Sequence, residues 1–197
     1  MSSTSVTDVE GLRALAHPAR LRILDLLRVH DRLTASECAA QLKLSPKSCS
    51  YHLHVLAKQG LVEQGPPLAE DTRQRPWQRR FDEVLMPLPG KNGGADSDNA
   101  RTDAIRAAAR HDLGLFLSFL ASPQAGSDDW ASSTTVHTRT ALMTPAELRA
   151  WGEAVEDITR RHVEKATRTR RDGRGPVRLA VRGFPQTAPE TGTGTAE

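Results

Sequence analysis

Residues 34–62 read TASECAAQLKLSPKSCSYHLHVLAKQGLV, and this stretch decides the fold. In its first part Thr34 is followed three residues later by Glu37. A hydroxyl and a carboxylate at this spacing cap the first turn of a helix reciprocally. We therefore predict a short helix over 35–42.

The second part of the stretch predicts a longer helix after a very short turn. Ser45 followed by Pro46 is the pattern of an N-cap with proline at the first helical position, where its missing N–H is not needed. Gly60 stands where a glycine commonly ends a helix. A helix over 46–58 that follows one over 35–42 so closely is typical of a helix-turn-helix.

The helix predicted over 46–58 has two chemically different sides. Cys49, Leu53 and Leu56 recur at helical spacing and are expected to pack on the preceding helices. The polar side chains lie off that stripe, and residues 42–62 contain no acidic residue. Because phosphates repel carboxylates, a polar face without acids is typical of a helix that enters the major groove of DNA.

The sequence upstream supplies the helices that would support this pair. Pro18 suits the first turn of a helix, and the leucines that follow it predict a helix over 18–30. Thr7 and Glu10 form another capping-box pattern, with Thr7 as the expected N-cap of a short preceding helix.

The sequence downstream predicts a β-hairpin. Residues 61–63 and 77–84 read as strands, and a loop rich in proline and charge joins them. Helices followed by such a hairpin have the order of a winged helix-turn-helix, with the β-wing over 61–84. The fold class is mainly α with small β (α+β), and the first domain is expected to span residues 1–86.

The motifs lie in LRALAHPARLRILDLL at residues 12–27 and in the stretch quoted first. The Ala-His-Pro-Ala-Arg opening at 16–20, the Ser-x-His-Leu-x-x-Leu core at 50–56 and the Gly-Leu-Val exit at 60–62 resemble the ArsR/SmtB-like winged-helix regulators of bacteria. The resemblance covers roughly residues 10–85. It implies a homodimer that binds double-stranded DNA at a near-palindromic operator.

The resemblance also implies which side chains would meet DNA. On the helix over 46–58 and at its cap, these are Ser45, Lys47, Ser48, Ser50, Tyr51 and His54. On the wing they are Arg73, Gln74 and Arg75 at the tip, with Arg79 and Arg80 on the return strand. The alternative is an ordinary amphipathic helix beside a solvated hairpin.

Three departures from the family pattern stand out. Lys43 occupies the turn where glycine is common, and the wing loop is long. The paired thiolates of the metal-sensing members are absent, because the corresponding residues 34–36 are Thr-Ala-Ser and Cys38 falls on the apolar side. No metal site and no cofactor are therefore expected.

The remainder of the chain is expected to join two subunits. The proline- and glycine-rich residues 87–102 predict a linker, 103–184 a C-terminal dimerisation region, and 185–197 a disordered tail. This region loosely resembles the dimerising tails of actinobacterial regulators. Whether it also binds a small-molecule effector is left open.

Apolar spacing predicts the elements of this region. Helices are expected over 103–121 and, after a capping box and a proline, over 145–165, and short strands over 131–142 and 177–182. The residues expected at the dimer interface are Leu113, Phe116, Leu120, Leu148, Trp151, Val155 and Ile158.

The two cysteines, Cys38 and Cys49, are too few for a disulfide framework. They are interpreted as small buried hydrophobic residues, with a redox pair or soft-metal ligands as the alternative. A metal site needs three or four ligands within reach, and no CxxC or HxxxH cluster is present.

Composition and motif searches exclude several classes of protein. The chain has 197 residues, a net charge of +3 and no apolar run long enough to span a membrane, and its N-terminus lacks the pattern of a secretory signal. A cytoplasmic protein is expected. No GxSxG, phosphate-binding loop or paired-acid signature is present, so an enzyme is not expected.

The sequence as a whole predicts a homodimeric, sequence-specific DNA-binding transcriptional regulator. Repression is favoured over activation because blocking a promoter needs no contact with the polymerase. The alternative is a protein-interaction module, or a small-molecule or redox sensor, that uses the winged helix mainly as a scaffold.

Overall fold

The computed structural model describes residues 3–67, 75–81, 83–86, 88–89, 94–168 and 175–186. The chain divides into two compact units, residues 1–133 and 134–197. Each unit is described by itself below.

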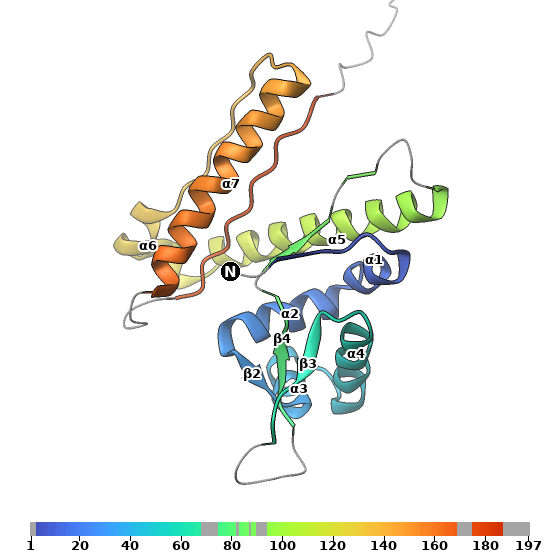
Figure 1. Ribbon diagram of the computed structural model, residues 1–197. Coiled ribbons are helices and arrows are strands. Elements are labelled where there is room, and N and C mark those ends of the chain that lie inside the picture. The colour runs from blue at the N-terminus through green and yellow to red at the C-terminus, as the bar shows by residue number, and fades with distance from the viewer. Residues whose placement is uncertain are drawn as a thin grey trace, which may run out of the picture. The chain divides into compact units, whose positions relative to one another are not determined.

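Four helices form the N-terminal part of the first unit (Figure 1). They are α1 (Val9–Leu15), α2 (Pro18–His30), α3 (Ala35–Leu42) and α4 (Pro46–Lys58). The three longer ones begin where the sequence predicts. The first differs in its cap, because the carboxylate of Asp8, and not the Thr7 hydroxyl, accepts from the N–H of Gly11 at 2.7 Å.

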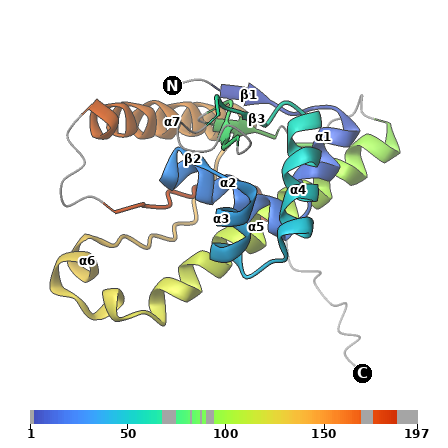
Figure 2. The same ribbon diagram turned by 90° about the horizontal axis from the view of Figure 1, so that it is seen from below.

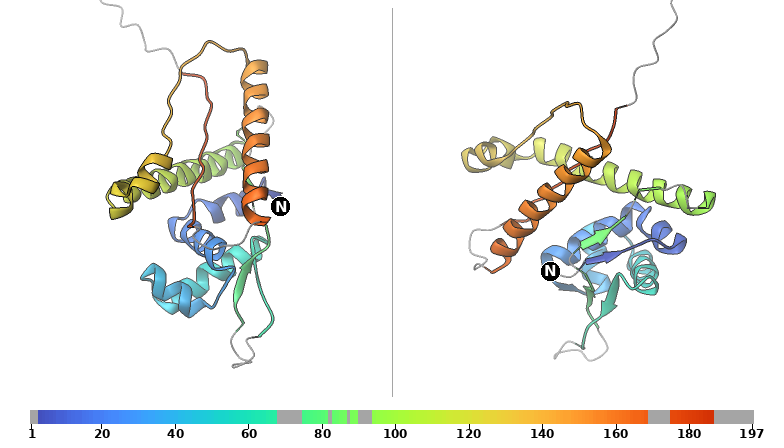
Figure 3. Two further views of the ribbon diagram at one scale, coloured as in Figure 1. Left: turned by 90° about the vertical axis from the view of Figure 1, so that its left-hand side faces the viewer. Right: turned by 45° about the horizontal axis from the view of Figure 1, so that its top comes forward.

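A three-stranded antiparallel sheet packs beside these helices. Its order is β2 (Arg32–Leu33), β4 (Trp77–Arg79) and β3 (Val62–Gln64). Strands β3 and β4 pair with Val62 opposite Arg79 and Gln64 opposite Trp77. This hairpin is the predicted wing, and it runs beside α4 and projects beyond the helices (Figures 1 and 3).

The return strand is shorter than predicted, because the chain changes partners after Arg79. Residues 83–85 form a separate strand, β5 (Glu83–Leu85), which pairs in parallel with β1 (Ser3–Ser5). The single strand predicted over 77–84 is therefore two short strands in two sheets.

The longest helix of the unit is α5 (Ala95–Leu120), which packs across α1 (Figure 2). It begins within the stretch predicted as a linker, and Ala100 and Ala104 are buried. Small side chains at these two positions let the helices approach closely. A 3-10 turn, η1 (Pro123–Gly126), and the short helix α6 (Asp128–Ser133) follow.

One hydrophobic core holds the first unit together. It is built from the apolar faces of α1 to α4, the sheet and the start of α5. Its largest fully buried side chains are Leu12, Leu15, Ile23, Leu27, Leu53, Leu56 and Val62. Burying a side chain of this size contributes about 1.5–3 kcal/mol each, so this core fixes how α4 is held.

The second unit is organised around α7 (Pro145–Arg168), with extended segments running along it (Figures 1 and 3). The helix agrees with the prediction, and Thr144 and Glu147 form its capping box. Residues 134–143 and 175–186 form no strand with any described residue, so the strands predicted over 131–142 and 177–182 are wrong. Residues 131–133 belong instead to α6.

The architecture confirms the predicted class, a winged helix-turn-helix of mainly α and small β structure followed by helices. The predicted tail lies mostly outside the described residues, which end at 186.

Candidate nucleic-acid interface

The turn between α3 and α4 is fixed by local hydrogen bonds. Thr34 caps α3 by accepting from the N–H of Glu37, whose carboxylate accepts in return from the Thr34 backbone N–H at 2.6 Å. The backbone N–H and the hydroxyl of Thr34 both donate to this carboxylate, and these two hydrogen bonds lower the pKa of Glu37. At the other end Lys43 takes the left-handed conformation, φ 56° and ψ 42°. The turn therefore forms without the usual glycine.

A polar cap starts α4. The hydroxyl of Ser45 accepts from the N–H of Ser48 at 3.1 Å, and Pro46 occupies the first turn. No acidic side chain stands in the first turn of α4, so nothing offsets the positive end of its dipole there. The positive charge of Lys47 and the positive end of the helix dipole together favour the binding of a phosphate at this end of α4.

The inner face of α4 is held by apolar packing on α2 and α3. Cys49, Leu53 and Leu56 are fully buried, as predicted. Cys49 meets Cys38 of α3 across the seam, and both cysteines are free thiols. Burial, with the neighbouring Cys49 thiol, raises the pKa of Cys38 to about 12, and burial also raises the pKa of Cys49. These are the buried thiols that the sequence predicts, and not reactive thiolates.

Two histidines join the start of α2 to the middle of α4. The ring centroids of His17 and His52 lie 4.5 Å apart, and Nδ1 of His17 accepts from the N–H of Ala19. Burial lowers the pKa of both imidazoles, and the positive charge of Arg20 lowers them further. Nδ1 of His52 is buried and has no hydrogen-bond partner among the described residues.

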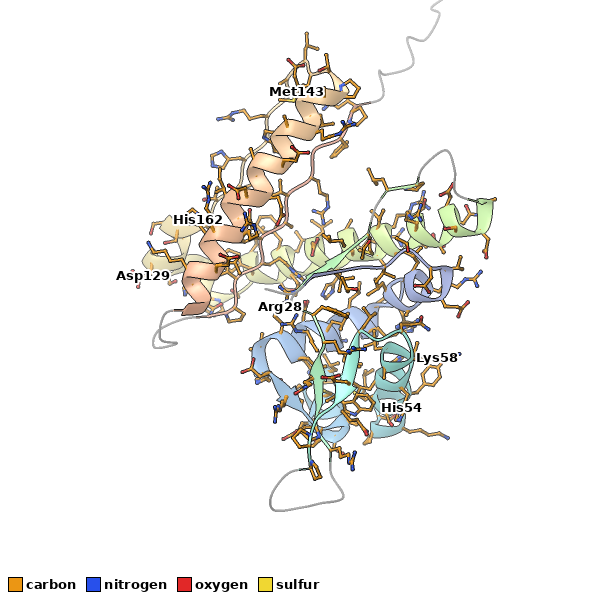
Figure 4. The ribbon with its side chains drawn as sticks, viewed as in Figure 1. Arg28, His54, Lys58, Asp129, Met143 and His162 are labelled. Carbon is orange, nitrogen blue, oxygen red and sulfur yellow. The ribbon has the colours of Figure 1, made fainter. Side chains whose placement is uncertain are left out.

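The outer face of α4 presents four exposed side chains in one row, Lys47, Tyr51, His54 and Lys58. Their spacing of four, three and four residues places them on one helical stripe. Tyr51 is 65% exposed. We call this stripe the reading row, and His54 and Lys58 are labelled on it in Figure 4. Lys58 was not among the predicted DNA contacts, although it follows His54 by four residues and so falls on the same side of a helix.

The other residues predicted on this helix flank the reading row. Ser48 and Ser50 are half-buried, on opposite sides of the row, and Ser45 is exposed at the cap. Their hydroxyls lie at the edge of the exposed face, where short donors suit contacts to phosphates.

The structure separates the predicted wing residues. Arg75 is exposed. Arg79 donates to the carbonyl of Phe81 at 2.7 Å, and Nε of Arg80 lies 3.4 Å from a carboxylate oxygen of Glu63. Both return-strand arginines thus have partners within the wing. Arg73 and Gln74 lie outside the described residues.

The residues predicted at the dimer interface occur in both units. On α5, Leu113 and Leu120 are 56% and 53% exposed, and Phe116 is half-buried. On α7, Trp151 and Ile158 are exposed, while Leu148 and Val155 are half-buried.

Neither a metal centre nor a membrane span is found in the described part of the chain. No three histidine, cysteine, aspartate or glutamate side chains there gather closely enough to hold a metal ion. None of its helices has both the length and the apolar character that crossing a bilayer requires.

One family model matches part of the first unit. Residues 15–65 match a family model described as a helix-turn-helix domain. The chain carries a helix-turn-helix. The match ends just after the first wing strand. It supports a helix-turn-helix domain, but it does not distinguish the ArsR/SmtB-like family from other proteins with this domain. No curated protein matches the sequence.

Several solved structures are similar over much of the chain. A double mutant of Lactococcus lactis ZitR in apo form is 17% identical, covers 75% of this chain and 83% of its own, and has a TM-score of 0.33. The YusO protein from Bacillus subtilis is 15% identical, covers 77% and 82%, and also has a TM-score of 0.33. A mutant of S. aureus MepR bound to an oligodeoxyribonucleotide is 18% identical, covers 58% and 72%, and has a TM-score of 0.29.

Proposed function

We propose that this protein is a sequence-specific DNA-binding transcriptional regulator that acts as a homodimer. Helix α4 enters the major groove with the reading row facing the bases, and the wing lies against the minor groove or the backbone. The major groove of B-DNA is about 12 Å wide, which admits one α-helix.

The reading row is the observation that carries this proposal. Four side chains that can bond bases or phosphates stand together on an exposed face with no acid among them, and the opposite face is anchored in the core. A rigidly held helix is what base reading needs, because a loosely held one would lose its register on the duplex.

The surrounding contacts would come from the helix cap and the wing. In this proposal Ser45, Ser48 and Ser50 bind the DNA backbone beside α4. The exposed Arg75 binds it from the wing, and Arg73 and Gln74, which lie outside the described residues, are assigned to the same contact from the sequence alone. Arg79 and Arg80 serve this contact only after they leave Phe81 and Glu63. These residues position the protein, while the reading row specifies the sequence.

Two-fold symmetry sets the form of the operator. A homodimer presents two copies of α4, so its site is near-palindromic, with half-sites about 10–10.5 bp apart or a multiple of that spacing. The exposed leucines of α5 and the apolar residues of α7 join the subunits. We place the protein with ArsR-like repressors, because of its motifs and because blocking a promoter needs no further contact. An effector would act by changing the spacing of the two helices.

A protein-interaction module is the second candidate, and one observation favours it. In the described part of the second unit no residue is buried, although several large apolar side chains are present. A partner protein would cover them. DNA binding would then be weak and the winged helix would act as a scaffold.

The decisive experiment selects bound fragments of genomic DNA with the purified full chain and measures affinity for the recovered sequence over a range of salt. We expect one enriched, near-palindromic sequence and an affinity that falls steeply as salt rises, because phosphate contacts release counterions.

Two matched variants complete the experiment. Tyr51→Ala should weaken binding to the enriched sequence more than to random duplex, and Arg75→Ala should weaken both alike. Val136→Ala, in the second unit, is the control. Recovery of no enriched sequence, together with binding that is indifferent to both variants, would favour the interaction module.

A further inference from the structure

We propose that His54 selects one base of the operator by accepting a hydrogen bond, through its Nε2, from an exocyclic amine in the major groove. The base is adenine, read at N6, or cytosine, read at N4. This inference rests on the proposed function and adds the chemistry of one position in the reading row.

The tautomer of His54 follows from one contact. Its Nδ1 lies 2.8 Å from the backbone carbonyl oxygen of Ser50, one turn earlier in α4. A carbonyl oxygen only accepts, so a contact this short requires a hydrogen on Nδ1. The Ser50 hydroxyl lies further away, at 3.4 Å. In the neutral imidazole Nε2 therefore carries the lone pair and is an acceptor.

The orientation of the ring is fixed from a second direction. Trp77, on strand β4 of the wing, meets the His54 ring edge to face, with the centroids 5.2 Å apart. Trp77 is itself buried, so its ring cannot move aside easily. The imidazole is held between its own helix and the wing, and DNA would meet it already oriented.

The neighbours on the reading row differ from His54 in what they offer. Lys47 and Lys58 only donate, and they suit phosphates or guanine. The Tyr51 hydroxyl both donates and accepts and rotates freely. Among the four side chains of the reading row, only His54 presents an oriented atom, Nε2, that accepts a hydrogen bond and does not donate one.

The base edges in the major groove fall into two groups, those that can donate a hydrogen bond to Nε2 of His54 and those that cannot. Adenine N6 and cytosine N4 carry hydrogens, whereas guanine N7 and O6 and thymine O4 are acceptors. An acceptor on the protein bonds the first group and is repelled by the second. His54 should therefore discriminate between the two members of each base pair at the position that it faces.

The test begins by locating that position. Fragments are selected with the wild type and with His54→Ala under identical conditions. The position that loses its preference only in the variant is then rebuilt with the amine replaced by hydrogen, using purine for adenine or the 4-unsubstituted pyrimidinone for cytosine. We expect this replacement to weaken binding by the wild type about 3- to 10-fold more than binding by His54→Ala, the range of one neutral hydrogen bond.

Two further variants sharpen the result. His54→Lys places a donor at the same point and should turn the preference at that position towards guanine. Lys58→Ala, from the same row, should weaken binding but leave the preference at the position that His54 faces unchanged.

The outcomes separate this inference from the proposed function. If the wild type enriches no sequence at all, the proposed function fails. If it enriches an operator and His54→Ala recovers the same preferences, or if removing the amine costs both proteins equally, the function stands and the inference about His54 is overturned.

Discussion

Lys43 shows how much of the helix-turn-helix depends on one backbone conformation. Its φ of 56° ends α3, and its N–H donates to the carbonyls of Ala39 and Ala40. A side chain in this region costs about 1–2 kcal/mol relative to a right-handed conformation. The sequence identified the position as a departure from the family, and the structure shows that the departure is tolerated as local strain.

Lys43→Gly should therefore stabilise the protein. Removing the side chain relieves the strain, while the greater freedom of glycine in the unfolded chain offsets about 0.5–1 kcal/mol of that gain. We expect the free energy of unfolding in urea to rise by about 0.5 kcal/mol. Lys43→Ala, which keeps the Cβ, is the control and should not stabilise. Equal effects of the two changes would contradict this explanation.

His17 and His52 give the stability of the domain a pH dependence. Burial lowers both pKa values below 6.5 in the folded protein, so the unfolded chain binds more protons as the pH falls through the interval below 6.5. Stability is therefore full above about pH 7 and decreases towards pH 5. We expect thermal unfolding midpoints to follow that direction.

His52→Gln should reduce this loss of stability, since it removes one of the titrating groups. The exposed His137→Gln is the matched control and should leave the loss unchanged. A profile that is identical in the wild type and in His52→Gln would show that the pair does not control it. Sequence reasoning could not find this pair, because the two rings meet only after α2 and α4 have packed.

At the scale of elements, the longer helices could be predicted, whereas the short helix α6 and most of the strands could not. Capping residues and apolar spacing are signals carried by residues close together in the sequence. Pro18, Thr34 and Ser45 therefore predict the starts of α2, α3 and α4 from a few neighbouring residues. Strands β1, β2 and β5 have only two or three residues, and their existence depends on partners far away in the chain. The start of α5 at Ala95 was hidden by the glycines that precede it.

Thr34→Ala tests how far the capping box supports α3. The change removes the hydroxyl that bonds Glu37 and leaves the carboxylate with one partner fewer. We expect a loss of about 1 kcal/mol in the free energy of unfolding, measured in urea at neutral pH. Ser36→Ala, exposed on the same helix, should cost little. A similar loss in both variants would mean that the hydroxyl of Thr34 is not the reason.

At the scale of the whole molecule, the sequence anticipated the long helices of both units, but not where α5 begins or which segments form strands. The predicted linker is partly helix α5, which belongs to the first unit through its contact with α1. The second unit has alternating apolar residues at 177–182 but no strand partner. Alternation describes one face of a segment, whereas a strand also needs a neighbour for its backbone.

Replacing Leu113 and Leu120 together by glutamate tests the proposed dimer. Both side chains are more than half exposed, so the variant should fold, and charges at these positions should oppose association. Sedimentation should report a dimer for the wild type and a monomer for the variant, with DNA affinity falling at least about tenfold because two half-sites are no longer bound together. Arg106→Glu, exposed on the same helix, is the control. A variant that remains dimeric would place the interface elsewhere.

The contact between Cys38 and Cys49 also provides a way to measure local opening of the protein. Both thiols are buried between α3 and α4 and resist ionisation, so an alkylating reagent can reach them only when α4 moves away from α3. The rate of labelling of the native protein therefore measures how often the domain opens, without any introduced probe. Bound operator DNA should lower the rate at which the two thiols are labelled.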